Sequence, residues 1–135
     1  MKRTDGPARK PMKQRYRPTG PDHEVVDLVL ERDQHSCVCC GENLQGIRGR
    51  DWSLHHRRGR GMGSTRRPET NLPANLVSVC GSGSTGCHGW LTENPALGRE
   101  QGLVLTQQDD PAGVPAATWY GVVLLDNRGS FAFVT

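Results

Sequence analysis

Cysteines and histidines account for most of the residues in this chain that can do chemistry. The cysteines include two pairs, Cys37 with Cys40 and Cys80 with Cys87. Thiolates are soft ligands, and the Cys-x-x-Cys spacing of the first pair lets two sulfurs face one ion. The sequence therefore predicts one tetrahedral zinc site made of these four cysteines. The fifth, Cys39, is expected to point away from the metal, because Cys-x-Cys spacing suits a single ion less well.

A second group of reactive side chains lies between and beside the cysteine pairs. It comprises the adjacent His55 and His56, then Asn75, and finally His88 directly after Cys87. Imidazoles bind divalent cations and take up protons near neutral pH. Each residue alone has an ordinary interpretation: a surface His pair, an Asn in a turn, and in His88 a zinc ligand replacing a cysteine. Their joint occurrence in this order favours a shared site.

The order and spacing of these residues resemble the HNH endonucleases, in particular the zinc-containing phage type. The matching stretch, residues 35–94, includes several positions that are not ligands. It reads Leu-His-His-Arg-Arg at 54–58, Arg-Gly-Met-Gly at 60–63, Pro-Ala-Asn-Leu at 73–76, Cys-Gly-Ser-Gly at 80–83 and Gly-Cys-His-Gly-Trp at 86–90. The insert between Cys80 and Cys87 is longer than in an ordinary zinc knuckle, and the phage group carries a similar insert.

The resemblance implies an α+β protein with the small ββα-metal (HNH) fold, a structural zinc knuckle, an N-terminal helix and a C-terminal β-hairpin appendage. It also implies metal-dependent hydrolysis of DNA phosphodiester bonds, by nicking or by double-strand cutting. In such a site His55 and His88 bind a catalytic cation (Mg²⁺, Mn²⁺ or another divalent ion), and His56 is the general base. Asn75 braces the loop and orients the base, and DNA phosphates are held by Arg57, Arg58 and Arg60.

The adjacency of His55 and His56 sets a geometric requirement. Successive side chains on a regular strand point to opposite faces. Both imidazoles can therefore reach one phosphate only if the strand bulges or ends at this point.

Two cationic blocks stand out in a chain whose net charge is only +3. Residues 1–20 contain seven Lys or Arg against one Asp, and residues 48–67 contain seven Arg against one Asp. Blocks of this kind favour a polyanionic partner such as DNA, and the second one surrounds the His pair. A solubility tail and a solvated charged loop are the plain alternatives.

A chain of 135 residues with 34% hydrophobic residues has a thin core, which a structural metal can stabilise. The pattern predicts a disordered basic tail at 1–20, a nuclease domain with its zinc site at 21–101 and a small β appendage at 102–135. The expected helices are 21–34, 87–93 and 95–101. The expected strands are 52–58, 75–79, 103–106, 119–125 and 130–134, with loops at 58–71 and 107–117.

Composition also bears on compartment and partners. The chain has no apolar signal segment or membrane-spanning run, and its odd number of cysteines fits a reducing compartment better than a set of disulfides. We therefore expect a cytoplasmic protein without a membrane partner, in the host cytoplasm if it is phage-encoded. The sequence does not determine the oligomeric state, and a monomer is favoured. The resemblance adds phage terminase subunits as possible partners in genome packaging. The rival hypothesis is a non-catalytic zinc module that binds DNA or a packaging partner.

Overall fold

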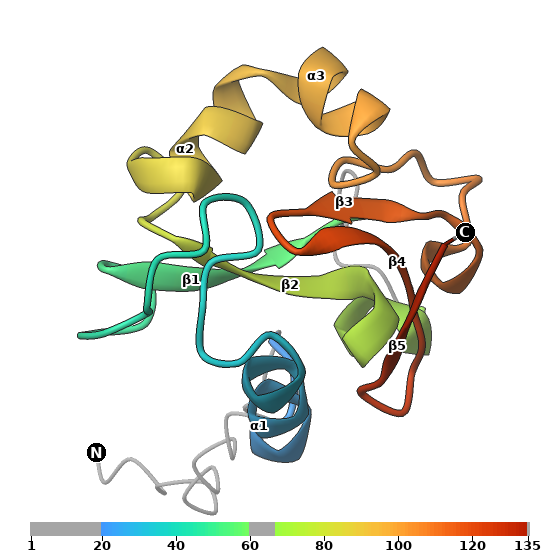
Figure 1. Ribbon diagram of the computed structural model, residues 1–135, viewed down its shortest axis with the longest axis horizontal. Coiled ribbons are helices and arrows are strands. Elements are labelled where there is room, and N and C mark those ends of the chain that lie inside the picture. The colour runs from blue at the N-terminus through green and yellow to red at the C-terminus, as the bar shows by residue number, and fades with distance from the viewer. Residues whose placement is uncertain (1–19, 60–66, 135) are drawn as a thin grey trace, which may run out of the picture.

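The computed structural model describes residues 20–59 and 67–134, and these ranges form three α-helices and two antiparallel sheets (Figure 1). The protein is therefore a small α+β fold. The helices are α1 (His23–Arg32), α2 (Gly86–Glu93) and α3 (Pro95–Glu100), close to the three that the sequence predicts. Arg60 and residues 1–19 of the predicted basic tail lie outside the described residues.

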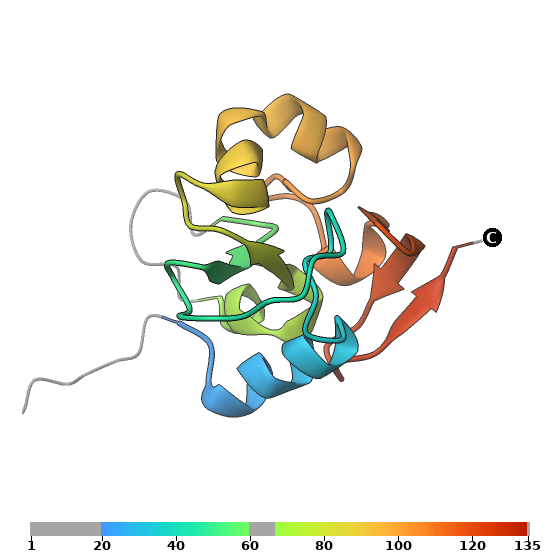
Figure 2. The ribbon, with the colours of Figure 1, turned by 60° about the vertical axis from the view of Figure 1, so that its left-hand side comes forward.

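The first sheet is a hairpin of β1 (Trp52–His56) and β2 (Leu76–Cys80). It lies between two helical layers, with α1 on one face and α2 on the other, as both views show (Figures 1 and 2). Alternation of side chains divides the strand residues between two cores. Leu54 and Leu76 pack with α1, whereas the opposite face joins the larger core of Val77, Val79, Leu91, Leu103 and other residues.

Two 3-10 turns lead from the long loop into β2. They are η1 (Pro68–Asn71) and η2 (Pro73–Asn75), and each begins with a proline whose fixed φ suits a first helical position. The second predicted strand consequently begins one residue late, after Asn75, which is the last residue of η2.

The second sheet consists of β3 (Ala116–Thr118), β4 (Gly121–Leu125) and β5 (Phe131–Phe133), in that order. The predicted C-terminal hairpin is thus confirmed with shorter strands, while β3 lies partly in a predicted loop that also holds the 3-10 turn η3 (Pro111–Gly113). The inner face of this sheet joins the larger core through Ala116, Val123 and Leu125.

The predicted strand at 103–106 is wrong. Its alternating Leu103 and Leu105 are both buried, but the segment makes only an isolated bridge, between Arg58 and Leu105. The physical reason is that β1 ends at His56, so the segment meets only the loop that follows it. Its apolar side chains fill the core without a ladder of strand hydrogen bonds.

The 20–59 and 67–134 ranges contain no helix long and apolar enough to cross a membrane.

Candidate metal centre and histidine site

Four cysteine sulfurs converge at one point. The Sγ atoms of Cys37, Cys40, Cys80 and Cys87 all lie within 4.8 Å of one another, and the Cys40 and Cys80 sulfurs are 3.9 Å apart. A tetrahedral zinc ion with Zn–S bonds near 2.3 Å holds its sulfurs about 3.8 Å apart. The four cysteines are therefore close enough to bind one metal ion and are compatible with structural zinc.

Two tight turns bring these sulfurs together. In the first, the Gly41 amide donates to the Cys37 carbonyl over 2.8 Å, and Gly41 adopts the positive φ of +78° that the reversal requires. The second turn joins Cys80, the last residue of β2, to Cys87 in the first turn of α2. A Cβ on Gly81 would lie 2.1 Å from the Thr85 carbonyl oxygen, so this turn closes only with glycine there.

The thiols affect one another electrostatically. Burial raises the pKa of Cys40 and Cys87, and the nearby Cys37 raises both further. The hydrogen bond from Cys39 lowers the pKa of Cys37 to about 4. A bound divalent cation would offset the repulsion among four neighbouring thiolates and deprotonate the remaining thiols.

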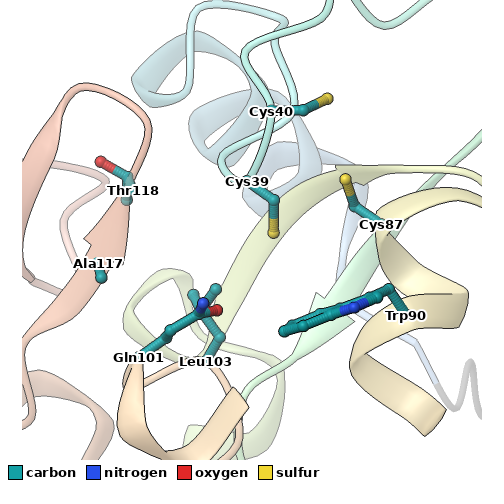
Figure 3. A pocket seen from close by; sticks show the side chains of 8 residues that line it. All are labelled: Cys39, Cys40, Cys87, Trp90, Gln101, Leu103, Ala117 and Thr118. Carbon is teal, nitrogen blue, oxygen red and sulfur yellow. The ribbon is translucent and has the colours of Figure 1, made fainter. Parts of the chain in front are cut away.

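Cys39 is not part of the four-sulfur group within the described residues. It lines a pocket of about 300 Å³ at the edge of the cysteine group, whose walls also include Cys40, Cys87 and Trp90. Figure 3 shows the Cys39 sulfur turned into this pocket and away from the Cys40 sulfur. This orientation agrees with the prediction that Cys39 points away from the metal.

A histidine pair lies next to the cysteine group, because His88 directly follows Cys87 in the first turn of α2. The rings of His55 on β1 and His88 on α2 meet edge to face, with centroids 5.3 Å apart. His55 Nε2 lies 2.7 Å from the Leu103 carbonyl oxygen, which can only accept, so Nε2 carries the proton and Nδ1 the lone pair. A backbone carbonyl on one ring nitrogen is the usual support for a histidine that binds metal through the other.

Burial favours the neutral form of both rings, which is the form that a metal ligand needs. Burial lowers the pKa of His55 to about 4, and burial together with the nearby His56 lowers that of His88. His88 Nδ1 is buried and has no hydrogen-bond partner in the described part of the chain. A buried polar atom without a partner points to a missing ligand or water.

His56 is the last residue of β1, and the ladder from Trp52 to His56 contains no bulge. His55 and His56 consequently leave the strand on opposite faces. The charge of His56 is close enough to lower the pKa of both His55 and His88. His56 Nε2 lies 2.8 Å from Oδ1 of Asn71, at the end of η1.

Asn75 joins the two ends of the long loop. It is fully buried, its Oδ1 accepts from the Arg58 amide over 2.7 Å, and its Nδ2 donates to the carbonyls of Arg58 and Thr70 over 3.0 and 2.9 Å. These contacts fit the expected bracing of the loop. Within the described residues the side-chain hydrogen bonds of Asn75 do not reach His56, which contacts Asn71 instead. No feature of the sequence marks Asn71, because an Asn after a Pro-Glu-Thr turn has no distinctive spacing.

Arg57 has a different place from the one predicted. It is 1% exposed, and burial lowers its pKa to about 10. Its guanidinium donates to four carbonyl oxygens over 2.6–2.9 Å, namely those of Ala74, Gly102, Pro111 and Val114. Arg57 is therefore a core residue that ties β1 to three distant segments, and not the phosphate ligand that the sequence predicted.

Arg58 keeps a donor available. It is 6% exposed and its Nη1 donates to the Asp109 carbonyl over 3.0 Å, but its buried Nη2 has no partner among the described residues. It lines a pocket of about 420 Å³ together with Arg67, Glu69 and Asp110. The second cationic block therefore divides into Arg57 inside the core, Arg58 at a pocket and the exposed Arg48, Arg50 and Arg67.

Comparisons of the chain with protein-family models, with curated proteins and with solved structures gave no match. The function of the site therefore rests on its own geometry and chemistry.

Proposed function

We propose that this protein is a metal-dependent DNA endonuclease of the HNH type, stabilised by a structural zinc ion. The observation that carries the proposal is the contact between His55 and His88, two imidazoles 33 sequence positions apart whose neutral form is favoured by burial, with His56 at the strand end beside them. Two histidines brought together from different elements can supply two ligands to one cation.

The four cysteines would hold zinc in a closed tetrahedron with no open coordination position, which is typical of a structural site. Cys37 and Cys40 belong to the turn after α1, and Cys80 and Cys87 to the turn between β2 and α2. Zinc would therefore fix the start of α2 on the hairpin. His88 follows Cys87 directly, so the same ion would set its position relative to His55.

The catalytic cation would be held by His55 and His88. The residues present fit it, because burial favours the neutral form of both imidazoles and His88 Nδ1 has no hydrogen-bond partner within the described ranges. A bound Mg²⁺, Mn²⁺ or similar ion supplies Lewis acidity that stabilises charge on the reacting phosphate.

His56 would act as the general base. It removes a proton from the water that attacks phosphorus, an effect of about 10²–10⁴-fold. Arg58, through the pocket that it lines with Arg67, would contact a phosphate of the DNA, and a guanidinium is well suited to this contact. The order β1, long loop, β2, α2 matches the strand–loop–strand–helix order of the ββα-metal fold and supports the family assignment. A phage origin, a location in the host cytoplasm and a terminase partner are parts of the same proposal.

A plasmid-nicking assay tests the proposal. Wild-type protein should convert supercoiled plasmid to the nicked or linear form with added Mg²⁺ or Mn²⁺ and not without it. His56→Ala should lose this activity. His23→Ala is the matched control, because His23 lies on α1 with 90% of its side chain exposed, and it should cleave like the wild type.

The alternative, a non-catalytic zinc module, gives a different result in the same experiment. Wild-type protein would bind DNA in a mobility-shift assay but would leave the plasmid supercoiled with every divalent cation tried.

A further inference from the structure

Asn71 is the side chain in direct contact with the proposed general base. Its Oδ1 lies 2.8 Å from His56 Nε2, a normal hydrogen-bond distance. The two residues come from different elements, since His56 ends β1 and Asn71 ends η1, on either side of the long loop.

This contact determines which ring nitrogen carries the proton. An amide oxygen has no hydrogen to donate, so the bond requires a proton on His56 Nε2. In a neutral imidazole the lone pair then lies on Nδ1. Nδ1 is therefore the nitrogen that can take a proton from water, and the ring is held with Nε2 toward η1.

Asn71 is itself held by the loop brace. The preceding residue, Thr70, is 3% exposed, and its carbonyl accepts from Asn75 Nδ2 over 2.9 Å. The same Asn75 side chain exchanges two hydrogen bonds with the backbone of Arg58, two residues after His56. Asn75 thus fixes η1 against the end of β1, and Asn71 transmits that geometry to the imidazole.

We infer that Asn71 is a positioning residue, which holds the His56 ring with Nε2 toward η1 and in its Nε2–H tautomer, so that Nδ1 is the basic nitrogen. The inference rests on the proposed nuclease function and assigns to Asn71 the orienting role that the resemblance implied for Asn75. Buried or half-buried partners of this kind typically change activity by about 10- to 100-fold.

The chemical step is balanced as follows. Water transfers a proton to His56 Nδ1 while its oxygen forms a bond to phosphorus, and the bond from phosphorus to the leaving sugar oxygen breaks. The resulting imidazolium carries protons on both nitrogens, and Asn71 Oδ1 continues to accept from Nε2. The leaving oxygen and His56 then exchange protons with solvent.

The first test reads the tautomer without any cleavage. Full-length zinc-loaded protein labelled with ¹⁵N-histidine is examined by two-bond ¹H–¹⁵N correlation at a pH where the ring is neutral, with His56→Ala assigning the signal. Wild-type His56 should show the Nε2–H tautomer. Asn71→Ala should give a mixture of tautomers, and Asn71→Asp, which keeps an acceptor oxygen at the same length, should retain Nε2–H.

The second test is kinetic. Asn71→Ala should lower kcat by about 10- to 100-fold with little change in KM, and Asn71→Asp should recover most of the loss. If Asn71 acts through His56, Asn71→Ala should add nothing in a His56→Ala background. An equal loss in that background would overturn the inference, as would an unchanged tautomer and kcat in Asn71→Ala.

The two proposals can fail separately. If the wild type cleaves DNA but Asn71→Ala changes neither tautomer nor kcat, this inference alone is overturned. If the wild type cleaves nothing with any divalent cation, the proposed function fails, and a catalytic role for Asn71 fails with it whatever the tautomer.

Discussion

The ring of His55 lies edge to face against the ring of His88, with their centroids 5.3 Å apart, and so links the middle of the hairpin to the first turn of α2. His56, the next residue along the strand, leaves on the opposite face and contacts Asn71. Two adjacent histidines therefore have different partners, and removing one or the other should have different consequences.

His55→Ala and His56→Ala should fail in different ways. Without His55 the cation loses a ligand, so divalent affinity should fall and excess Mn²⁺ should recover part of the cleavage. Without His56 the rate should fall about 10²–10⁴-fold, with no rescue by cation but partial rescue at high pH, where hydroxide replaces the base. Cleavage rate measured against cation concentration and pH separates the two. Metal rescue of His56→Ala instead would reverse the assigned roles.

Zinc should be present at about one ion per chain, because four thiolates close a tetrahedron. Cys37→Ser and Cys80→Ser should lose zinc and unfold or aggregate. Cys39→Ser is the matched control, since Cys39 is outside the four-sulfur group, and it should keep both zinc and fold. Elemental analysis and circular dichroism provide the measurements. Active protein free of zinc would contradict the assignment.

Asn75→Ala should destabilise the protein by about 2–4 kcal/mol, because it leaves a buried amide and two carbonyls without their partner. The expected signature in urea unfolding is a lower midpoint with an unchanged slope. Asn43→Ala, at an exposed loop position, should shift the unfolding free energy by no more than about 0.5 kcal/mol. Equal effects of the two changes would show that the loop brace contributes little.

Arg57 and Arg58 should separate stability from DNA binding. Arg57→Lys cannot satisfy four carbonyls with one ammonium group and should cost about 3 kcal/mol or more. Its folded form should bind DNA like the wild type. Arg58→Ala should weaken DNA binding and flatten the dependence of log affinity on log salt by roughly 0.9 for one lost phosphate contact on duplex DNA. Fluorescence anisotropy without added divalent cation measures the DNA affinity of both variants. Weaker DNA binding by Arg57→Lys together with unchanged binding by Arg58→Ala would contradict the burial of Arg57.

His55 should make stability depend on pH in the acidic range. Its folded pKa, about 4, lies below the ordinary histidine pKa of 6.5, so between these values the unfolded chain binds more protons. Its contribution is present above about pH 6.5 and is lost as pH falls toward 4. After allowance for the partial exposure of His55, the expected loss of unfolding free energy is about 2 kcal/mol. Other titrating groups contribute equally to the wild type and to His55→Asn. Plots of unfolding free energy against pH for the two proteins should therefore diverge between pH 6.5 and 4. Parallel curves would contradict the low pKa.

The local elements follow from the sequence because their determinants are local. Apolar spacing and prolines place α1, α2 and α3 within a few residues, and period-two alternation already puts His55 and His56 on opposite faces. Cys-x-x-Cys spacing identifies two zinc ligands, since the turn that aligns them spans only four residues. The α+β class and the second cysteine pair were predictable through the resemblance to HNH endonucleases, which carry a similar insert between those cysteines.

Tertiary packing alone decides what each side chain meets. Arg57 and Arg58 are adjacent and chemically identical, yet Arg57 ends among four carbonyls from distant segments while Arg58 keeps a donor at a pocket. The segment with Leu103 and Leu105 alternates like a strand, but it has only a loop beside it. Asn71 reaches His56 because η1 folds back across the end of β1. Sequence periodicity encodes the direction in which a side chain leaves the backbone, whereas its partner depends on where segments dozens of residues away come to rest.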